Sequence, residues 1–365
     1  MPKYVLYGTP FSFYTAKARA YFQVKGIPFE EVFATAKVYK SVIKPRTGVQ
    51  MIPVVATPDG EYLQDTAAII DALEQRHPEP AILPSTPRQR MLCLLLEAWA
   101  DEWLLLPAMH YRWNHDNTPY IYEQFGQVAG PWLPAFIRRR LGKKLAARFA
   151  GFVPKLGIHG HVPRALEHWF ENTILPALQQ HFSDHDFVLG ERPSLADVSL
   201  MGPFYAHLYS DPAPGKLLRE KAPALCDWIE RMRNVQPDEQ LQWLPDDAIP
   251  NTLAPLVADV FEHLWPMLAN TVVAVEEWAL TYADERALPR GIGEHQFRFG
   301  TTQANRVVLP FQQWKMQRIL DAWAQLSEAQ QRDVQDWLQP YVGEQGLAFA
   351  IHRPVTRRDN RIWLQ

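Results

Sequence analysis

The sequence predicts an α/β domain over residues 1–80, then a helical domain over 86–238 and a mostly helical extension over 245–365. Three observations support this fold class. Short β-rich runs alternate with helical patterns at the start of the chain. Prolines cluster near residues 77–87 and 237–250, where we expect the domain boundaries. The remaining sequence repeats apolar residues at helical spacing.

The first elements form a strand–helix–strand unit. KYVLY (3–7) is a β-rich run, residues 13–25 carry a helical pattern that Gly26 ends, and PFEEVFA (28–34) is a second strand candidate. Because the three elements fit within about 35 residues, they indicate a parallel βαβ unit.

An antiparallel pair and a helix complete the predicted domain. MIPVVAT (51–57) and EYLQ (61–64) are strand candidates joined by the turn residues Pro58-Asp59-Gly60. Residues 66–76 follow as a helix. The order βαβ followed by ββα is that of the thioredoxin-like fold.

Capping signals mark helix starts in the second region. Thr86 can cap a helix, Pro87 fits its first turn, and Gln89 can return a hydrogen bond to the cap. The pattern is helical from there to about residue 233, with a second capping signal at Ser194-Leu195-Ala196-Asp197.

The extension also shows helical signals. Apolar residues between 253 and 264 follow helical spacing, and Ser327-Glu328-Ala329-Gln330 is a further capping box. The alternation in HQFRF (295–299) predicts one short strand.

The composition is that of a folded protein and argues against several functional classes. Hydrophobic residues make up 47% of the 365 residues, and the formal net charge of -3 does not favour a nucleic-acid binder. Cys93 and Cys226 cannot form a disulfide framework or a multi-cysteine metal site. Neither a secretory signal pattern nor an apolar run of about 18 residues occurs, so we expect a soluble cytoplasmic protein.

Four motifs resemble the glutathione S-transferase superfamily. VLYGTPFSFYTAKAR (5–19) is similar to the loop between the first strand and first helix of its Ser- and Cys-type classes. Ile52-Pro53-Val54 is similar to its Val-Pro element, and Gln64-Asp65-Thr66 to its Glu-Ser pair. FVLGERPSLADVSL (187–200) resembles its capping signature. The resemblance spans about residues 3–233 and implies a glutathione-binding domain followed by an all-helical glutathione-transferase domain.

The resemblance implies that glutathione binds as a cosubstrate along Ile52, Pro53 and Val54. A cis bond before Pro53 would let Val54 offer its N–H and C=O to the cysteinyl part of glutathione, whereas a trans proline would simply open a strand. Thr66 is expected to bind the γ-glutamyl carboxylate at a helix N-terminus, and Asp65 the ammonium. The alternative for both residues is helix capping, which the same geometry allows.

Ser12 is the expected hydrogen-bond donor to the glutathione sulfur. It occupies the position of the catalytic serine or cysteine of the similar classes, where a hydroxyl would lower the thiol pKa below about 8.5. Tyr7 lies where the tyrosine-type classes place their donor. The alternatives are a helix cap for Ser12 and a core aromatic for Tyr7. Residues 5–19 contain no cysteine, which argues against glutaredoxin-like thiol exchange.

The first long helix offers apolar residues for an electrophile pocket. Its candidates are Trp99, Trp103, Met109, Tyr111 and Trp113. The alternative is that these helix-spaced residues form core. Asp101 and Glu102 could reach the glutathione ammonium of a neighbouring subunit.

Residues 124–166 contain eight basic residues and neither Asp nor Glu. Over 132–155 the basic residues are mixed with aromatic and aliphatic ones, a pattern that suits an amphipathic helix on an anionic membrane surface. The segment could also steer anionic substrates, form a solvated helix face, or pack as a lid on the core.

These features together predict a glutathione transferase-like enzyme that activates the glutathione thiol for attack on a small hydrophobic electrophile. Family members usually dimerise, so a homodimer is expected. The alternative is a non-catalytic binding protein of the same fold, peripheral to membranes. Nucleic acid is not an expected partner. A metal is not expected either, since the pairs His110 with His115 and His159 with His161 lack further ligands at suitable spacing.

Overall fold

The computed structural model describes residues 3–238, 240–342, 347 and 349–365. The chain forms two compact units, each assembled from three segments. Unit 1 contains Met1–Ile82, Pro107–Val153 and Asp197–Gln240, and unit 2 contains Leu83–Leu106, Pro154–Ala196 and Leu241–Gln365. The continuous domain ranges expected from the sequence remain predictions.

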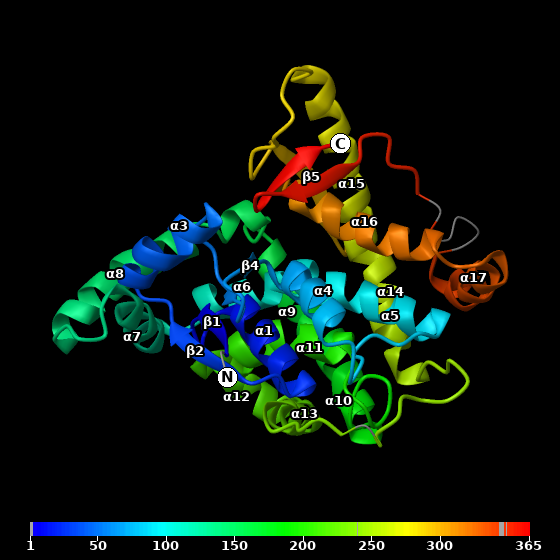
Figure 1. The fold of residues 1–365 in the computed structure, drawn as a ribbon, viewed down its shortest axis with the longest axis horizontal. Coiled ribbons are helices and arrows are strands. Elements are labelled where there is room, and N and C mark those ends of the chain that lie inside the picture. Colours follow the sequence, from blue (N-terminus) through cyan, green and yellow to red (C-terminus); the bar gives the residue numbers. More distant parts are fainter. Residues whose placement is uncertain (1–2, 239, 343–346, 348) are drawn as a thin grey trace. The chain divides into compact units, whose positions relative to one another are not determined.

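Unit 1 contains a mixed sheet with the strand order β2-β1-β3-β4. Figure 1 labels β1, β2 and β4 of this sheet. The strands are β1 (Tyr4–Gly8), β2 (Phe29–Phe33), β3 (Val54–Ala56) and β4 (Tyr62–Gln64). β1 runs parallel to β2, while β3 is antiparallel to both β1 and β4. This topology confirms the predicted thioredoxin-like arrangement of βαβ followed by ββα.

Two predicted helices of this unit begin and end at local signals. α1 (Phe13–Lys25) begins after Ser12, whose side chain accepts from the Thr15 N–H, and ends at Gly26. Gly26 has φ 62°, a left-handed conformation that glycine adopts without a steric penalty. α4 (Thr66–Arg76) begins after Asp65 and packs against α1.

The sequence analysis missed a helical segment between β2 and β3. It consists of α2 (Ala36–Val38), the wider π-type turn η1 (Tyr39–Ile43) and α3 (Lys44–Thr47). Thr35 starts the segment by accepting a hydrogen bond from the Val38 N–H at 3.3 Å. Its apolar side chains cover the Val54 side of the sheet, because Val38, Tyr39 and Ile43 pack in one cluster with Val54. A run this short, broken by Pro45, carries too little periodicity to be predicted.

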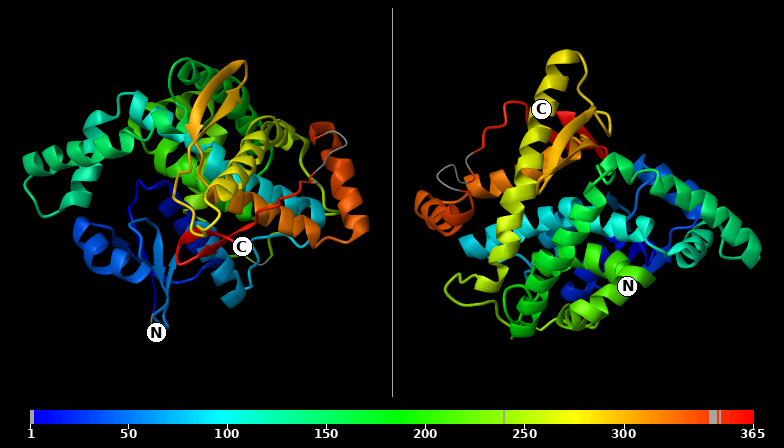
Figure 2. Two further views of the ribbon diagram at one scale, coloured as in Figure 1. Left: turned by 90° about the horizontal axis from the view of Figure 1, so that it is seen from above. Right: turned by 180° about the vertical axis from the view of Figure 1, so that it is seen from behind.

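The other helices of unit 1 follow the predicted helical pattern. They are α6 (Leu105–Asn114), α7 (Thr118–Ala129), α8 (Ala135–Ala150), α11 (Leu195–Pro203), η5 (Phe204–Tyr209), α12 (Pro212–Lys221) and α13 (Pro223–Arg233). α7 and α8 form an antiparallel hairpin that is visible in every view (Figures 1 and 2).

Unit 2 is mostly helical, as predicted for the extension, and adds two small hairpins. Its helices are α5 (Pro87–Ala98), η2 (Trp99–Trp103), η3 (Pro154–Leu156), α9 (Val162–Trp169), η4 (Phe170–Ile174), α10 (Leu175–Asp184), η6 (Asn251–Leu253), α14 (Ala254–Asp259), η7 (Val260–Leu264), α15 (Trp265–Thr281), α16 (Phe311–Ala324) and α17 (Glu328–Val342). Its strands are β5 (Glu294–Phe299), β6 (Thr302–Val307), β7 (Val355–Arg358) and β8 (Arg361–Leu364).

Two local predictions for the extension are confirmed. β5 covers the strand expected at 295–299. The capping box also forms, because the Ser327 N–H donates to the Gln330 side chain at 3.0 Å and the Gln330 N–H to Ser327 Oγ at 3.4 Å. The β7–β8 hairpin was missed, although Asp359 and Asn360 at its turn have φ 50° and 57°, a conformation these residue types tolerate.

The start of α5 corrects one prediction. Thr86 precedes the helix, but its side chain makes no capping hydrogen bond to the backbone. The carboxylate of Asp247 instead accepts from the Arg88 N–H at 2.7 Å and the Gln89 N–H at 2.9 Å. A carboxylate at a helix N-terminus also has a favourable interaction with the helix dipole. The cap is therefore supplied by a residue far along the chain.

Trp99 and Trp103 belong to the core of unit 2, which favours the core interpretation over an electrophile pocket for both. Each is fully buried. The Trp99 indole donates to Asp259 at 2.6 Å, and Trp103 stacks on His263 and Phe299.

Asp101 and Glu102 are also committed to this core. Asp101 pairs with Lys315 at 2.7 Å, and Glu102 accepts from the Gln312 amide at 2.9 Å. The expectation that these two carboxylates reach a bound ligand is therefore not supported.

Candidate functional site

The register of the sheet brings three sequence motifs to one edge of unit 1. Tyr7 of β1 lies opposite Val54 of β3, and Val54 lies opposite Gln64 of β4. The end of β1, the start of β3 and the end of β4 therefore meet in one row. The loop that leads to Ser12, the Ile52-Pro53 step and the Asp65-Thr66 pair all continue from this row.

Ser12 is a half-buried helix cap at this edge. Its Oγ accepts from the Thr15 N–H at 3.3 Å, and its own N–H donates to the Thr9 carbonyl at 3.1 Å. These contacts fix the hydroxyl at the N-terminus of α1, where the helix dipole favours a negative charge. Capping uses a lone pair of the oxygen and leaves the hydroxyl proton able to donate.

Tyr7 lies in the same row, but its ring packs with core residues. Side chains alternate along β1, so Tyr7 points away from the face that carries the fully buried Leu6. Its ring packs with the cluster of Ala34, Ile43 and Val54 and stacks on Tyr62 with 6.4 Å between ring centres. Burial has the largest effect on the pKa of the Tyr7 phenol and raises it, and the neighbouring Tyr62 raises it further. The phenol therefore stays protonated at neutral pH.

The Ile52–Pro53 peptide bond is cis, as the sequence analysis expected. Val54 follows as the first residue of β3, is fully buried, and has strands on both sides. Ile52 precedes the strand and is partly exposed. The backbone of Ile52 is therefore better placed than that of Val54 to meet a ligand at this edge.

Asp65 and Thr66 present two different polar groups at the start of α4. The Asp65 carboxylate accepts from the Ala67 and Ala68 N–H groups at 3.0 and 3.2 Å, so it caps the helix. Asp65 itself has φ 77°, which turns the chain sharply into the helix. Thr66 is 1% exposed, and its hydroxyl has no hydrogen-bond partner among the described residues. A buried polar group without a partner is unusual and calls for an explanation, such as a ligand.

Arg112 holds the loop before Ser12, and the sequence analysis missed it. Its Nη1 donates to the Phe11 carbonyl at 2.9 Å, and its guanidinium makes a two-pronged pair with Asp211 at 2.6 and 2.8 Å. The Arg112 side chain is 4% exposed, and that of Asp211 is fully buried. A lone arginine on a helical pattern gives no sign of a partner 99 residues away, so only the structure identifies this role.

His207 completes the contacts of Arg112 as a neutral imidazole. A guanidinium has donors only, so His207 Nε2 must accept from Arg112 at 2.7 Å. The proton then lies on Nδ1, which donates to the Ala108 carbonyl at 3.2 Å. Burial, together with the positive charge of Arg112, holds the pKa of His207 well below its usual value. Burial raises the pKa of the Asp211 carboxyl, whereas the positive charge of Arg112 lowers it.

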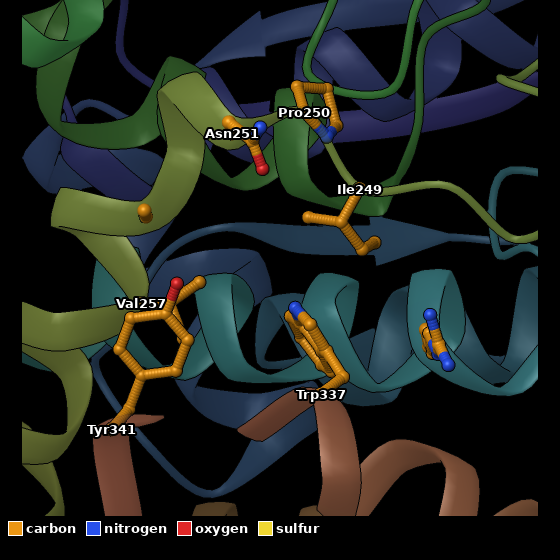
Figure 3. Close-up of a pocket in the computed structure, with 8 residues that line it drawn as sticks. Ile249, Pro250, Asn251, Val257, Trp337 and Tyr341 are labelled. Carbon is orange, nitrogen blue, oxygen red and sulfur yellow. The ribbon is translucent and has the colours of Figure 1, made fainter. Parts of the chain in front are cut away.

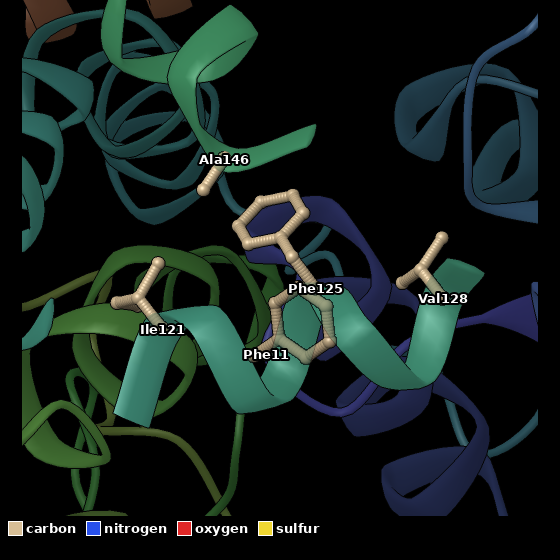
Figure 4. Packing of buried hydrophobic residues seen from close by; sticks show 5 residues of the cluster. All are labelled: Phe11, Ile121, Phe125, Val128 and Ala146. Carbon is tan, nitrogen blue, oxygen red and sulfur yellow. The ribbon is translucent and has the colours of Figure 1, made fainter. Parts of the chain in front are cut away.

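Phe11 connects the same loop to the α7–α8 hairpin. It packs with Ile121, Phe125, Val128 and Ala146, and its ring meets that of Phe125 nearly edge-on at 5.2 Å (Figure 4). The loop that carries Ser12 is thus held by Arg112 through its backbone and by the hairpin through Phe11.

Arg46 is a second residue of interest that the sequence analysis did not select. It is exposed, lies over the Tyr62 ring at 5.3 Å, and lowers the pKa of Tyr7 as a minor effect. It therefore places a positive charge beside the Tyr7–Val54–Gln64 row.

The two cysteines and a pair of histidines are the other candidate groups of the sequence. Cys93 and Cys226 are free and buried, as expected for core thiols. His110 and His115 lie with their Nε2 atoms 3.4 Å apart, and the expectation that they bind no metal stays a prediction.

Unit 2 contains a cavity. Its volume is about 230 Å³, and it lies between residues 249–257 and α17 (Figure 3). Arg88 is the one charged residue among those that line it, and Arg88 is already paired with Asp333. We assign this cavity no function.

Two family profiles match the chain. Residues 6–81 match the glutathione S-transferase N-terminal domain, and residues 171–235 match the glutathione S-transferase C-terminal domain. The first match contains every site residue of the sheet edge. The maleylacetoacetate isomerase of Pseudomonas aeruginosa is 27% identical over 161 residues, which cover 42% of this chain and 56% of that protein. The chain thus spans little more than half the length of this curated relative.

Solved structures with similar folds are distant in sequence. A glutathione S-transferase from Rhodospirillum rubrum has a TM-score of 0.42 and 17% identity, with 69% of this chain and 98% of that chain covered. A beta-etherase from Sphingobium sp. has a TM-score of 0.45 and 18% identity, with coverages of 64% and 96%. The family assignment therefore applies to the matched parts of the chain: residues 6–81 belong with the N-terminal domain, and residues 171–235 with the C-terminal domain, of the glutathione S-transferases.

Proposed function

We propose that the chain binds glutathione at the sheet edge of unit 1 and activates its thiol. The observation that carries this proposal is the Tyr7–Val54–Gln64 row, which gathers Ser12, Pro53 and Thr66 at one edge. The N-terminal domain match over residues 6–81 supports the same ligand.

The polar groups of this edge complement the tripeptide. The γ-glutamyl carboxylate would accept from the unpartnered Thr66 hydroxyl and from the N-terminus of α4. Asp65 would accept from the ammonium while it caps the helix. The cysteinyl backbone would pair with Ile52 as an added strand, and Arg46 is the cation that we propose for the glycyl carboxylate.

Ser12 is the residue that we propose to stabilise the thiolate. A hydroxyl donor at a helix N-terminus favours the anion and lowers the pKa of the thiol, so more thiolate is present at neutral pH. Tyr7 is the second candidate: its phenol is protonated and can donate, but it packs with Tyr62 and the core cluster. We therefore favour Ser12 and the serine type of the superfamily.

The reaction that we propose is attack of the glutathione thiolate on a small hydrophobic electrophile, in a transfer or isomerisation. The similarity to a maleylacetoacetate isomerase supports this class without selecting the substrate. Met109, Tyr111 and Trp113 remain candidates to contact the electrophile. We further propose a cytoplasmic homodimer, with glutathione-binding, helical and extension domains over 1–80, 86–238 and 245–365.

Isothermal titration with glutathione and steady-state assays with a panel of electrophiles test this proposal. Thr66→Val should weaken glutathione binding about tenfold, because a hydrogen bond to a charged group is lost. Ser12→Ala should lower kcat/KM on the order of a hundredfold and change affinity little. Ser41→Ala is the matched control, since its hydroxyl is exposed and bonds only to the nearby Lys37 carbonyl in the described structure.

The outcomes separate the alternatives. Unchanged turnover in Ser12→Ala would make Ser12 a structural cap and move the assignment to Tyr7. Glutathione binding without turnover of any electrophile would support a non-catalytic binding protein. Absence of binding in the unmodified chain would refute the proposed site.

A further inference from the structure

The outer side of the α7–α8 hairpin is basic and aromatic. Trp132 is 66% exposed and Phe136 is 75% exposed. Five cations on α8 are exposed as well: Arg139, Arg140, Lys143, Lys144 and Arg148. We call these seven residues the α8 basic surface. Phe136, Arg140, Lys143 and Lys144 recur at helical spacing and therefore lie on one face of α8.

The hairpin does not need these residues for its own packing. α8 approaches α7 so closely at Gly142 that a Cβ there would clash with the Tyr122 carbonyl oxygen. Ala146 and Phe125 fill the contact between the helices, and Phe149 joins them with its ring 5.0 Å from that of Phe125. The apolar area of Trp132 and Phe136 is left in water, which is unfavourable unless a partner covers it.

The loop that carries Trp132 is held in place. Arg138 Nη1 donates to the Pro131 and Leu133 carbonyls, both at 3.3 Å, while its Nη2 pairs with Glu123 at 2.8 Å. Trp132 thus projects from a fixed loop next to the first turn of α8.

The charges of this surface are not balanced by ion pairs with other described residues. Arg138 is committed to Glu123, whereas none of the five exposed cations forms an ion pair within the described part of the chain. Residues 124–166 contain no acidic residue to balance them, although the whole chain has a net charge of -3. The positive charge is therefore concentrated locally, and a second copy of this face would be repelled.

We propose that the α8 basic surface docks the chain on an anionic lipid bilayer. The five cations would lie against lipid phosphates, and Trp132 and Phe136 would insert at the headgroup level, where aromatic side chains are favoured. The chain stays peripheral, because among the residues described here no helix is long and apolar enough to cross a bilayer. This docking is independent of glutathione binding.

Flotation with vesicles tests the proposal on the full chain. Binding is expected to vesicles of phosphatidylcholine with phosphatidylglycerol, not to phosphatidylcholine alone, and is expected to fall as salt rises. The triple variant Arg140→Glu, Lys143→Glu, Lys144→Glu should weaken binding on the order of a hundredfold or more. The double variant Trp132→Ser, Phe136→Ser should weaken it about tenfold or more while leaving the salt dependence in place.

Matched controls exist in unit 2. Arg286→Glu, Arg290→Glu, Arg298→Glu changes the net charge equally at exposed positions, and Leu280→Ser, Tyr282→Ser removes two other exposed apolar side chains, which are 70% and 48% exposed. Circular dichroism should show that all variants stay folded, since every changed side chain is exposed.

Three results would overturn the proposal. The first is no binding to anionic vesicles, and the second is equal loss of binding in the control variants. The third is evidence that another partner occupies the surface. Such evidence would be self-association of the chain that the double variant Trp132→Ser, Phe136→Ser abolishes. It would also be binding to duplex DNA that the triple variant abolishes, in a chain that does not bind vesicles.

Discussion

Asp65 in unit 1 and Asp259 in unit 2 are both aspartates next to helices, yet their surroundings differ. Asp259 is 4% exposed and accepts from the indoles of Trp99 and Trp169, both at 2.6 Å, and from His263 at 2.7 Å. Asp65 is partly exposed and caps α4 beside Thr66, whose buried hydroxyl has no partner in the part of the chain that the structure describes.

The difference separates two uses of polar side chains. A buried carboxylate whose acceptor sites are filled by its own chain stabilises the fold and has little left to offer a ligand. A buried hydroxyl that has no partner among the described residues still has its donor and its acceptor sites free. Asp101 and Glu102 resemble Asp259 in that they are buried and have partners within unit 2, namely Lys315 and Gln312.

Removal of the Asp259 carboxylate is expected to have the largest effect on stability. Asp259→Ala leaves two buried indole N–H groups and His263 without their acceptor, so we expect unfolding to be easier by about 3–5 kcal/mol. Urea denaturation measures the change, and the exposed Asp284→Ala is the control, with less than about 0.5 kcal/mol expected. A small effect at Asp259 would mean that this network does not stabilise unit 2.

Arg112 tests the effect of a buried, paired side chain that lies beside the proposed site. Arg112→Met removes the pair with Asp211 and the bond to the Phe11 carbonyl, so we expect a loss of about 3 kcal/mol in stability. Turnover of the remaining folded protein should also fall, since the loop before Ser12 is released. Thermal unfolding and kcat/KM report the two effects separately, with the exposed Arg139→Met as control.

His181 tests whether burial in unit 2 shows in the pH dependence. Burial lowers the pKa of His181 from 6.5 to about 4, and its Nδ1 lies 2.8 Å from Thr252 Oγ1. As pH falls below 6.5, the His181 side chain becomes protonated in the unfolded chain but stays neutral in the folded chain. Protonation therefore favours the unfolded chain. The stability that the neutral His181 contributes is present above pH 6.5 and is lost as pH falls toward 4. We expect about 2 kcal/mol to be lost by pH 5.

Urea midpoints measured between pH 7 and pH 5 check this expectation. His181→Gln should flatten the dependence, whereas His161→Gln, at an exposed position, should not. An unchanged slope in His181→Gln would show that other groups cause the acid sensitivity.

The smallest predicted effect compares two caps of one helix. Asp247→Ala should destabilise the protein by about 1 kcal/mol, because its carboxylate caps α5 at the Arg88 and Gln89 N–H groups. Thr86→Ala should change stability by less than about 0.5 kcal/mol, since Thr86 makes no capping bond to the backbone. Denaturation of both variants side by side decides which residue is the cap.

Much of unit 1 could be predicted from the sequence. The strands, the start of α1 at Ser12 and its end at Gly26 depend on residues within a few positions of one another. The cis bond before Pro53 was expected from a family resemblance rather than from spacing. The segment 36–47 was missed, because short and irregular helical turns leave no periodic pattern.

The order of the elements, the capping box at Ser327 and the residues of the proposed glutathione edge could be found from local patterns in the chain. Only the tertiary structure decided which distant groups meet: Asp247 with α5, Asp259 with two tryptophans, and Arg112 with the Phe11 carbonyl. The two groups of interactions differ in how far apart their partners lie along the chain. Turns and caps are formed by neighbours along the chain, whereas the partner of a buried charge is chosen by the packing of the whole unit.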